Sequence, residues 1–569
     1  GFGGAAGIRI SAATLEIAGS PTAYTITAIG TGGDGATGSD GLTTGGIGGD
    51  GGDGTGGGTL FEVIAAAVQT GLVGLDSQGF GGTSGNGGVA SSGTPSAGGI
   101  SGNGFGGTAA LTNTDTGGTA FGAVALGDVT LNTNGNAGIS SGVRGTASFG
   151  RIDIKDNATA PGGSLGANSI LAVSIGTATS PGITGGIFVE SAGDPLNVTN
   201  SVGLFTSGAI GFTFSGNGSL VAGGTLSAIA DGNITATHAG QPATPVDSIV
   251  ANGIVFDTRA NFSTDAASRI RSASTLDIDA LGNIAAGNLF SVNRVSAGAL
   301  GNITLGNAAV TGTVSPPFGG PPTNGVIELR AGIDPKVSSG TFQPADITIT
   351  GNVSATGHIL AEAGNDIIVA TGANILSDNR ITFRSGDDIL VRTGAVVRAA
   401  NNPLPEFGYG VTGPLDEPAL LAFDAGAISV SPSVPGNVAA IIVDGTIGAP
   451  GRAVTLTGGA IQADANAITA KHFYANIRNA PLVGTPANND SGQLRADCVA
   501  GNICLGTLTV SDTVAIGPLS GAIGLPNRVA VAGNVNALDA SIRARDAIVF
   551  GTAGAAATIN GTNRLAIAA

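Results

Sequence analysis

The chain has 569 residues, of which 101 are glycine, and carries a formal net charge of −16. It has no Met or Trp and only three Tyr, so a thin core of small and β-branched side chains in a repeat architecture is favoured over an ordinary globular core. With only 22 Lys and Arg, it has no basic patch to neutralise phosphates, which argues against nucleic-acid binding.

The chain begins with "GFGGAAG", without an initiator Met or a signal-peptide pattern. We therefore expect a processed or interior piece of a longer protein. No run of eighteen apolar residues occurs, which argues against a membrane-spanning helix.

Two glycine-rich segments follow in the first third. Residues 30–58 hold 16 Gly in 29 positions, and residues 79–107 hold 13 in 29. The two starts lie 49 residues apart, which suggests one decoration inserted twice. Such segments cannot bury an apolar core of their own, so we expect extended excursions on the side of the fold.

The first of these segments contains "GGDGGDGTG" at 48–56, which matches a calcium-binding nonapeptide except that Thr55 replaces the large aliphatic residue. Asp50 and Asp53 would supply hard oxygen ligands. A calcium roll needs tandem copies, and one is present. The alternative is an acidic, flexible loop, and no other cofactor is expected.

Short runs of alternating apolar residues occur along the whole chain, each closed by Gly, Asn or Asp. They are typical of half-buried strands joined by tight turns. The clearest lie at 7–17, 23–29, 128–133, 150–156, 274–280, 346–350 and 453–458.

A Gly-Asn-Ile phrase recurs among these runs. It starts at 282 and again at 301, 19 residues later, while "GNDI" at 364 and "GDDI" at 386 are 22 apart. Periods near twenty residues filled with short strands indicate a solenoid. The predicted fold is all-β, a parallel β-helix of roughly twenty coils.

The recurrent Asn or Asp is expected at solenoid corners, where these residues tolerate turn conformations and bond to nearby backbone. The following Ile would point inward. Stacked corners would form a ladder of side-chain amides and carboxylates, made of Asn233, Asn283, Asn302, Asn352, Asn365, Asp387 and Asn502.

The repeats become more regular after about residue 225. We therefore predict an irregular solenoid with glycine-rich insertions over 1–225 and a more regular one over 226–569. Pro-rich stretches at 315–322, 401–418 and 432–436 are predicted to be loop insertions.

The two cysteines, Cys498 and Cys504, flank a Gly-Asn turn. A short-loop disulfide is expected, which would fit an oxidising compartment. The alternative is a pair of reduced, buried thiols.

Phrases such as "GGTLSAIADGNITATH" (223–238) and "ALGNITLGNAAV" (299–310) resemble the repeats of filamentous haemagglutinin-type adhesins. These are secreted passengers of two-partner secretion and of related autotransporters. The resemblance implies that the predicted β-helix is a right-handed parallel β-helix. It further implies an extracellular, non-enzymatic filament or stalk on a bacterial surface, acting in adhesion, aggregation or biofilm. It also implies an outer-membrane secretion partner, contact with host, neighbouring-cell or matrix surfaces, and self-association or covalent continuation into a fibre.

Two other functions stay open from the sequence. One is a calcium-dependent surface binding module at Asp50 and Asp53. The other is a β-helix polysaccharide depolymerase, in which Asp366 and the Asp387–Asp388 pair, one coil apart, would flank a glycosidic bond. The absence of Trp argues against the second, because carbohydrate clefts commonly use aromatic platforms.

Overall fold

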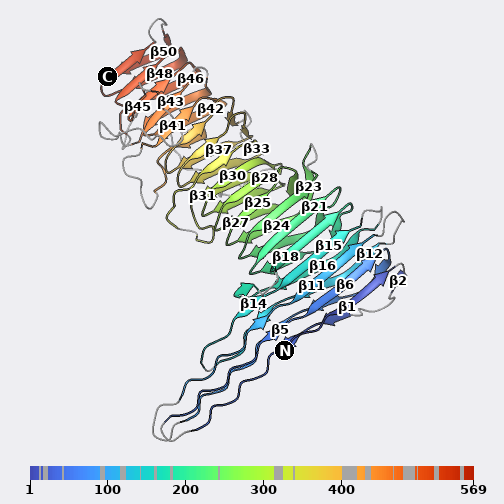
Figure 1. Cartoon of the computed structure of the whole chain (residues 1–569). Coiled ribbons are helices and arrows are strands. Elements are labelled where there is room, and N and C mark those ends of the chain that lie inside the picture. Colours follow the sequence, from blue (N-terminus) through green and yellow to red (C-terminus); the bar gives the residue numbers. More distant parts are fainter. Residues whose placement is uncertain are drawn as a thin grey trace, which may run out of the picture. The chain divides into compact units, whose positions relative to one another are not determined.

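The structure is a computed structural model that divides into two compact units, Gly1–Ala273 and Ser274–Ala569 (Figure 1). It describes the chain except for residues 12–13, 17–23, 41–43, 90–95, 116–122, 141, 159–162, 180–183, 241–243, 313–324, 338–339, 400–418, 430–437, 465–466, 479–493, 496–497, 518–523 and 552–556. The described residues are strands, turns and extended segments. None of them forms a helix long and apolar enough to cross a membrane.

The first unit contains short strands that wind as successive coils. They are β1 (Ala6–Ser11), β2 (Thr14–Glu16), β3 (Tyr24–Thr27), β4 (Gly30–Thr31), β5 (Gly54–Thr55), β6 (Gly58–Ile64), β7 (Ala67–Gln69), β8 (Val73–Asp76), β9 (Gly79–Phe80), β10 (Gly104–Phe105), β11 (Thr108–Thr114), β12 (Val124–Asn132), β13 (Gly135–Asn136), β14 (Ala147–Phe149), β15 (Arg151–Asn157), β16 (Leu165–Ser174), β17 (Ala178–Thr179), β18 (Gly186–Ala192), β19 (Leu196–Val198), β20 (Val202–Thr206), β21 (Ala209–Ser215), β22 (Leu220–Ala230), β23 (Ile234–Ala239), β24 (Val246–Thr258), β25 (Phe262–Thr264) and β26 (Ser268–Ser272).

The second unit continues with the same kind of element. Its strands are β27 (Thr275–Ala280), β28 (Ile284–Ser291), β29 (Arg294–Ala299), β30 (Ile303–Val310), β31 (Val326–Ala331), β32 (Ile347–Ile349), β33 (Asn352–Ala355), β34 (His358–Ala363), β35 (Ile367–Val369), β36 (Asn374–Ser377), β37 (Arg380–Ser385), β38 (Ile389–Val391), β39 (Val396–Ala399), β40 (Ala419–Asp424), β41 (Ala440–Val443), β42 (Thr446–Gly458), β43 (Ala460–Ala463), β44 (Ile468–Ile477), β45 (Asn502–Leu505), β46 (Leu508–Ile516), β47 (Arg528–Val531), β48 (Val535–Arg543), β49 (Ala547–Phe550) and β50 (Ile559–Ala568).

Strands of successive coils pair in parallel and in register. In the second unit, β34, β35 and β36 form the three sides of one coil, and β37, β38 and β39 lie above them in the next. Each of the three pairings has the same 22-residue offset, for example Ile367 with Ile389. An earlier pair of coils is offset by 19 residues, as in Thr275 with Arg294. The predicted parallel β-solenoid is therefore confirmed.

The core consists of stacked inward-facing side chains, mostly Ile, Val, Leu and Ala. Ile234, Ile284 and Ile303, which follow the repeated Gly-Asn, are each at most 1% exposed. The rings of Phe383 and Phe423 stack with centroids 5.0 Å apart. Alternation of buried and exposed positions along each strand produces this ladder, because neighbouring side chains on a strand point to opposite faces.

Three excursions leave the first unit at the same corner of three successive coils. Their bases pair as two small parallel sheets, β4–β9–β13 and β5–β10–β14–β17. The segments at 30–58 and 79–107 are therefore side excursions, as expected. A third, at 133–150, has fewer glycines and was not predicted.

The predicted change from irregular to regular repeats at residue 225 falls inside strand β22. Contacts divide the chain after Ala273. The change in composition near 225 marks where the repeats become regular, and strand pairing continues across it. The Pro-rich stretches at 315–322, 401–418 and 432–436 lie outside the described residues.

Candidate functional site

A ladder of Asn and Asp side chains follows one corner of the second unit. In each step, one side-chain oxygen (Oδ1) accepts the backbone N–H of the residue in the equivalent position of the next coil. The chain of acceptors is Asn283, Asn302, Asp346, Asp366 and Asp388, with N–O distances of 2.8, 2.9, 3.1, 3.0 and 2.8 Å, the last from the Ala440 N–H.

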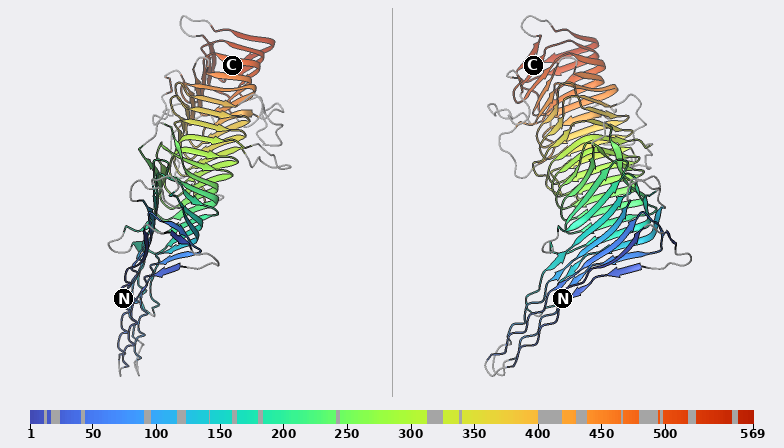
Figure 2. Two further views of the ribbon diagram at one scale, coloured as in Figure 1. Left: turned by 90° about the vertical axis from the view of Figure 1, so that its right-hand side faces the viewer. Right: turned by 45° about the vertical axis from the view of Figure 1, so that its right-hand side comes forward.

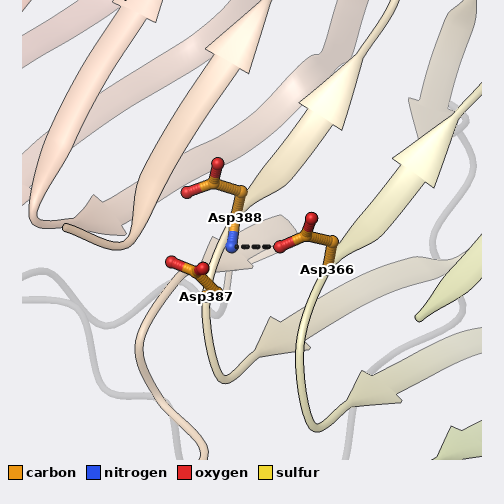
Figure 3. Close-up of side chains that lie close together, drawn as sticks. All are labelled: Asp366, Asp387 and Asp388. Atoms are coloured by element: carbon orange, nitrogen blue, oxygen red, sulfur yellow. Dashed lines mark hydrogen bonds between the residues drawn. The ribbon is translucent and has the colours of Figure 1, made fainter. Parts of the chain in front are cut away.

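Three carboxyl groups gather in this ladder, at Asp366, Asp387 and Asp388 (Figure 3). One carboxylate oxygen from each lies within 4.8 Å of the others. The residues are 2%, 6% and 1% exposed. Two coils supply them, because Asp366 precedes β35 and the other two precede β38 directly above it. Among the described residues, this is the one group whose spacing would suit a metal ion.

Burial determines the electrostatics of this cluster. Burial is the largest cause, and together with the neighbouring carboxyl groups of Asp387 and Asp366 it raises the pKa of Asp388 to about 8, against the lowering effect of the Ala440 N–H. A charged carboxylate loses its hydration in such a site, and like charges nearby disfavour ionisation. At neutral pH the cluster therefore holds a proton.

This arrangement is suited to holding a proton within the wall of the solenoid. Glycoside cleavage requires two carboxyl groups that flank a substrate bond, and these carboxyl groups are buried together at one corner. One oxygen each of Asp366 and Asp388 already accepts a backbone N–H. The cluster would offer a metal ion three carboxylates only after losing its proton.

The remaining residues of the predicted corner ladder fall in several places. Asn365 donates its side-chain amide to Asp346 at 2.7 Å, and the Asp387 N–H bonds to the Asn365 carbonyl at 3.1 Å. In the first unit, Asn233 Oδ1 accepts the Asn261 N–H at 3.1 Å. Asn502 lies at the start of β45, three coils beyond Asp388 in the same column.

Asn352 belongs to a second ladder at the next corner. Its N–H bonds to Asn307 Oδ1 at 2.8 Å, and its own Oδ1 accepts the Asn374 side chain at 3.0 Å. Asn307 in turn donates to Asn288 at 2.9 Å. The Gly-Asn phrase therefore marks two different corners of the coil, whereas the sequence analysis placed all of these residues in a single ladder.

Cys498 and Cys504 form a disulfide, with Cα atoms 5.8 Å apart. Both residues are fully buried. The bond ties the turn before β45 to the strand itself, and Cys498 Sγ also contacts the Ile461 carbonyl of the coil below at 3.4 Å.

The three excursions of the first unit pack together into a body that we call the glycine bundle (Figure 2). Its outgoing legs are residues 30–40, 77–89 and 133–140. Its return legs are residues 44–57, 96–107 and 142–150. Legs of the same kind lie parallel in one layer, and the outgoing and return layers run antiparallel to each other.

Backbone hydrogen bonds join the legs at every third residue. Within the layers, Gly32, Gly35 and Gly38 donate to Phe80, Thr83 and Asn86, and Gly48, Gly51 and Gly54 donate to Ala97, Ile100 and Asn103. Between the layers, Gly82, Gly85 and Gly88 donate to Gly52, Gly49 and Gly46 at 2.8, 2.8 and 2.7 Å. This period of three matches the polyproline II helix, which has three residues per turn and no internal hydrogen bonds.

Glycine is needed where the legs touch, because the interior of the bundle is backbone. A Cβ on Gly48 would lie 2.0 Å from the Gly85 carbonyl oxygen, and one on Gly85 would lie 1.8 Å from the Ala36 oxygen. Gly33, which faces outward, has nothing within 4 Å. The glycine pattern therefore specifies close packing of the legs against one another.

Asp50 and Asp53 lie in the first return leg and accept backbone bonds. Asp50 Oδ1 accepts the Ile100 N–H at 2.8 Å, and Asp53 Oδ1 accepts the Asn103 N–H at 2.7 Å. Asp34 and Asp40 do the same for Thr83 and Val89 in the outgoing layer, each at 2.8 Å. These carboxylates join one excursion to the next, and the calcium hypothesis is not needed to explain their recurrence.

In comparisons with known proteins, no family model, no curated protein and no solved structure matches this chain.

Proposed function

We propose that this chain is part of an extracellular structural filament or stalk of a bacterial surface adhesin, acting in adhesion, aggregation or biofilm. The observation that carries the proposal is the combination of a parallel β-solenoid with a lateral bundle of hydrogen-bonded legs. The adhesin-like repeat phrases supply the functional class.

The proposed mechanism is mechanical. Strands of successive coils are joined by continuous backbone ladders and by the Asn and Asp corner bonds. The strands of each coil are hydrogen-bonded to those of the next, so local opening must break several bonds together. Such a body would resist extension and proteolysis while its excursions present a contact surface.

Two further features support an extracellular location. Disulfides persist in oxidising compartments, and the chain carries one between Cys498 and Cys504. The acidic net charge of −16 would keep a large fibre soluble. Under this proposal, an outer-membrane secretion partner exports the chain, and further repeats or further copies continue the fibre.

The proposal is tested by labelling producing cells with gold-tagged antibody against the chain and scoring attachment with and without its Fab fragment. Label along thin surface fibres, with attachment reduced by the Fab, is the expected result. Label confined to the cell interior, or attachment that the Fab leaves unchanged despite bound label, would contradict the proposal.

A further inference from the structure

Exposed large apolar residues concentrate on one part of the molecule. Seven such residues among those described are at least half exposed, and all lie on the glycine bundle or against its base: Phe2, Ile47, Val89, Ile100, Ile139, Val143 and Ile175. Elsewhere in both units, large apolar side chains are mostly buried. Clustered exposure of this kind marks interaction surfaces in soluble proteins.

Three of these residues share the outer side of the return-leg layer, one on each leg. The Gly51 N–H of the first return leg donates to the Ile100 carbonyl, which places the second return leg beside Asp50. The Ser101 N–H of the second return leg donates to the Val143 carbonyl, which places the third return leg beside the second. Ile47 lies one turn from Asp50, roughly 9 Å along the leg. We call this surface the return-leg face; it comprises Ile47, Asp50, Asp53, Ala97, Ile100 and Val143.

The fold does not need the apolar side chains of this face. Its interior contacts are made by the glycines between them, such as Gly48 and Gly51, which are packed against backbone. Ile47 and Val143 are 74% and 63% exposed, so they bury little surface within the chain. The hydrogen bonds of the legs hold them in fixed rows, which lowers the entropy cost of binding.

The negative charge of the bundle indicates which kind of partner the return-leg face would bind. Its legs carry the carboxylates of Asp34, Asp40, Asp50 and Asp53, and Arg144 is their one cationic side chain. Docking two copies of the return-leg face would oppose Asp50 and Asp53 with like charges, and an anionic membrane would be repelled. A cationic partner has the complementary charge.

We propose that the return-leg face binds a segment of another protein that presents aliphatic side chains next to Lys or Arg. Aliphatic groups of the partner cover Ile47, Ile100 and Val143, while its cations lie against Asp50 and Asp53. The inference rests on the proposed function in one respect: it identifies the contact surface through which a surface fibre would adhere.

The test is a binding titration of the purified full chain with three fluorescent synthetic peptides of equal length. Their repeats are Leu-Lys-Gly, Leu-Ser-Gly and Ser-Lys-Gly, which present both features, the aliphatic one alone and the cationic one alone. We expect the first peptide to bind at least about tenfold more tightly than either of the others, a difference of about 1.4 kcal/mol.

Two variants locate the contact. Ile47→Ser with Ile100→Ser should weaken the Leu-Lys-Gly peptide about tenfold. Asp50→Asn with Asp53→Asn keeps the oxygens that accept the Ile100 and Asn103 N–H groups but removes the charge, so it should weaken binding and flatten its dependence on salt. The matched control is Val89→Ser with Ile139→Ser on the outgoing layer, which should leave binding unchanged.

Three results would overturn the inference: equal affinity for all three peptides, no binding of any, or equal weakening by the control pair. Self-association that Ile47→Ser abolishes would instead make a second copy the occupant. None of these results bears on surface location or on antibody-blocked attachment, so failure here is distinct from failure of the proposed function.

Discussion

The solenoid of the second unit and the glycine bundle of the first both use hydrogen bonds between neighbouring segments to pair their backbone groups. They differ in the residues that fill their interiors. Both stack extended segments that are joined to their neighbours by backbone hydrogen bonds. In the solenoid, every second side chain points inward, and the core is mostly Ile, Val, Leu and Ala with some Phe. In the bundle, most of the inward-facing residues are glycines, which recur along each leg with a period of three.

The difference shows what each sequence period encodes. A period of two with β-branched residues specifies a strand that buries side chains. A period of three with glycine specifies legs whose backbones touch, so stability there comes from hydrogen bonds and close contact with little apolar burial. Removing atoms should harm the solenoid, and adding atoms should harm the bundle.

The largest effect is expected from Phe383→Ala in the solenoid. Phe383 is fully buried and stacks on Phe423, so truncation should lower the free energy of unfolding by about 3–5 kcal/mol. Denaturant unfolding measures the loss. Leu376→Ala, at a position 45% exposed, is the control and should change little; equal losses in the two variants would contradict the core assignment.

Gly85→Ala should produce the next largest effect, confined to the bundle. Its Cβ would lie 1.8 Å from the Ala36 oxygen, and overpacking of this kind costs about 1–3 kcal/mol. Faster amide exchange over residues 30–40 would report the loosening. Gly33→Ala adds the same methyl group where nothing lies within 4 Å, so it should leave exchange unaltered; loosening by both variants would argue against specific packing.

Asp388→Asn should change how stability depends on pH. The folded chain holds the Asp388 proton up to a pKa of about 8, while the unfolded chain releases it near the ordinary value of 3.8. Stability from this group is therefore present at low pH and lost as pH rises through that window. The variant should flatten this decline, measured as melting temperature against pH.

Asp34 offers a control of opposite sign. It is exposed, and the hydrogen bonds from Thr83 lower its pKa. Any stability that it contributes is lost as pH falls, so Asp34→Asn should leave the decline at higher pH in place. An unchanged decline in the Asp388→Asn chain would show that this group does not hold the proton.

The smallest effect is expected at Asp50. Asp50→Ala removes the acceptor of the Ile100 N–H, and an exposed hydrogen bond of this kind contributes about 1 kcal/mol or less. Amide exchange at residues 96–107 should rise modestly in Asp50→Ala and stay unchanged in Asp50→Asn. A loss of similar size in both would mean that the charge, and not the hydrogen bond, joins the legs.

Much of the solenoid could be predicted because its signal is local. The alternating run at 274–280 and the spacing between the phrases at 282 and 301 predict β27 and the 19-residue coil directly. Asp346 was missed as a ladder residue. Its phrase "DITI" parallels "NITL" at 302–305, but a longer coil of 44 residues separates the two and obscures the period.

The bundle and the buried acidic cluster were less predictable because they depend on contacts between coils. High glycine content predicted two excursions. The third contains few glycines, with Ala137, Ser140 and Thr146 between them, so its composition does not mark it as an excursion. The burial of Asp366 and Asp388 follows from the corner that they share. The apolar return-leg face emerges only when legs that are 43 to 50 residues apart in the sequence are placed side by side.

Hydrogen–deuterium exchange of the glycine-rich segments tests the central claim most directly, namely that they form a hydrogen-bonded bundle. The account predicts slow exchange in residues 44–57, 79–89 and 96–107 for the amides that donate to a neighbouring leg, which are two of every three, such as Gly48, Gly49, Gly51 and Gly52. Their protection should be comparable to that of the neighbouring strands β6 and β11. Exchange of all these amides at the rate of an unstructured chain, while β6 and β11 stay protected, would contradict it.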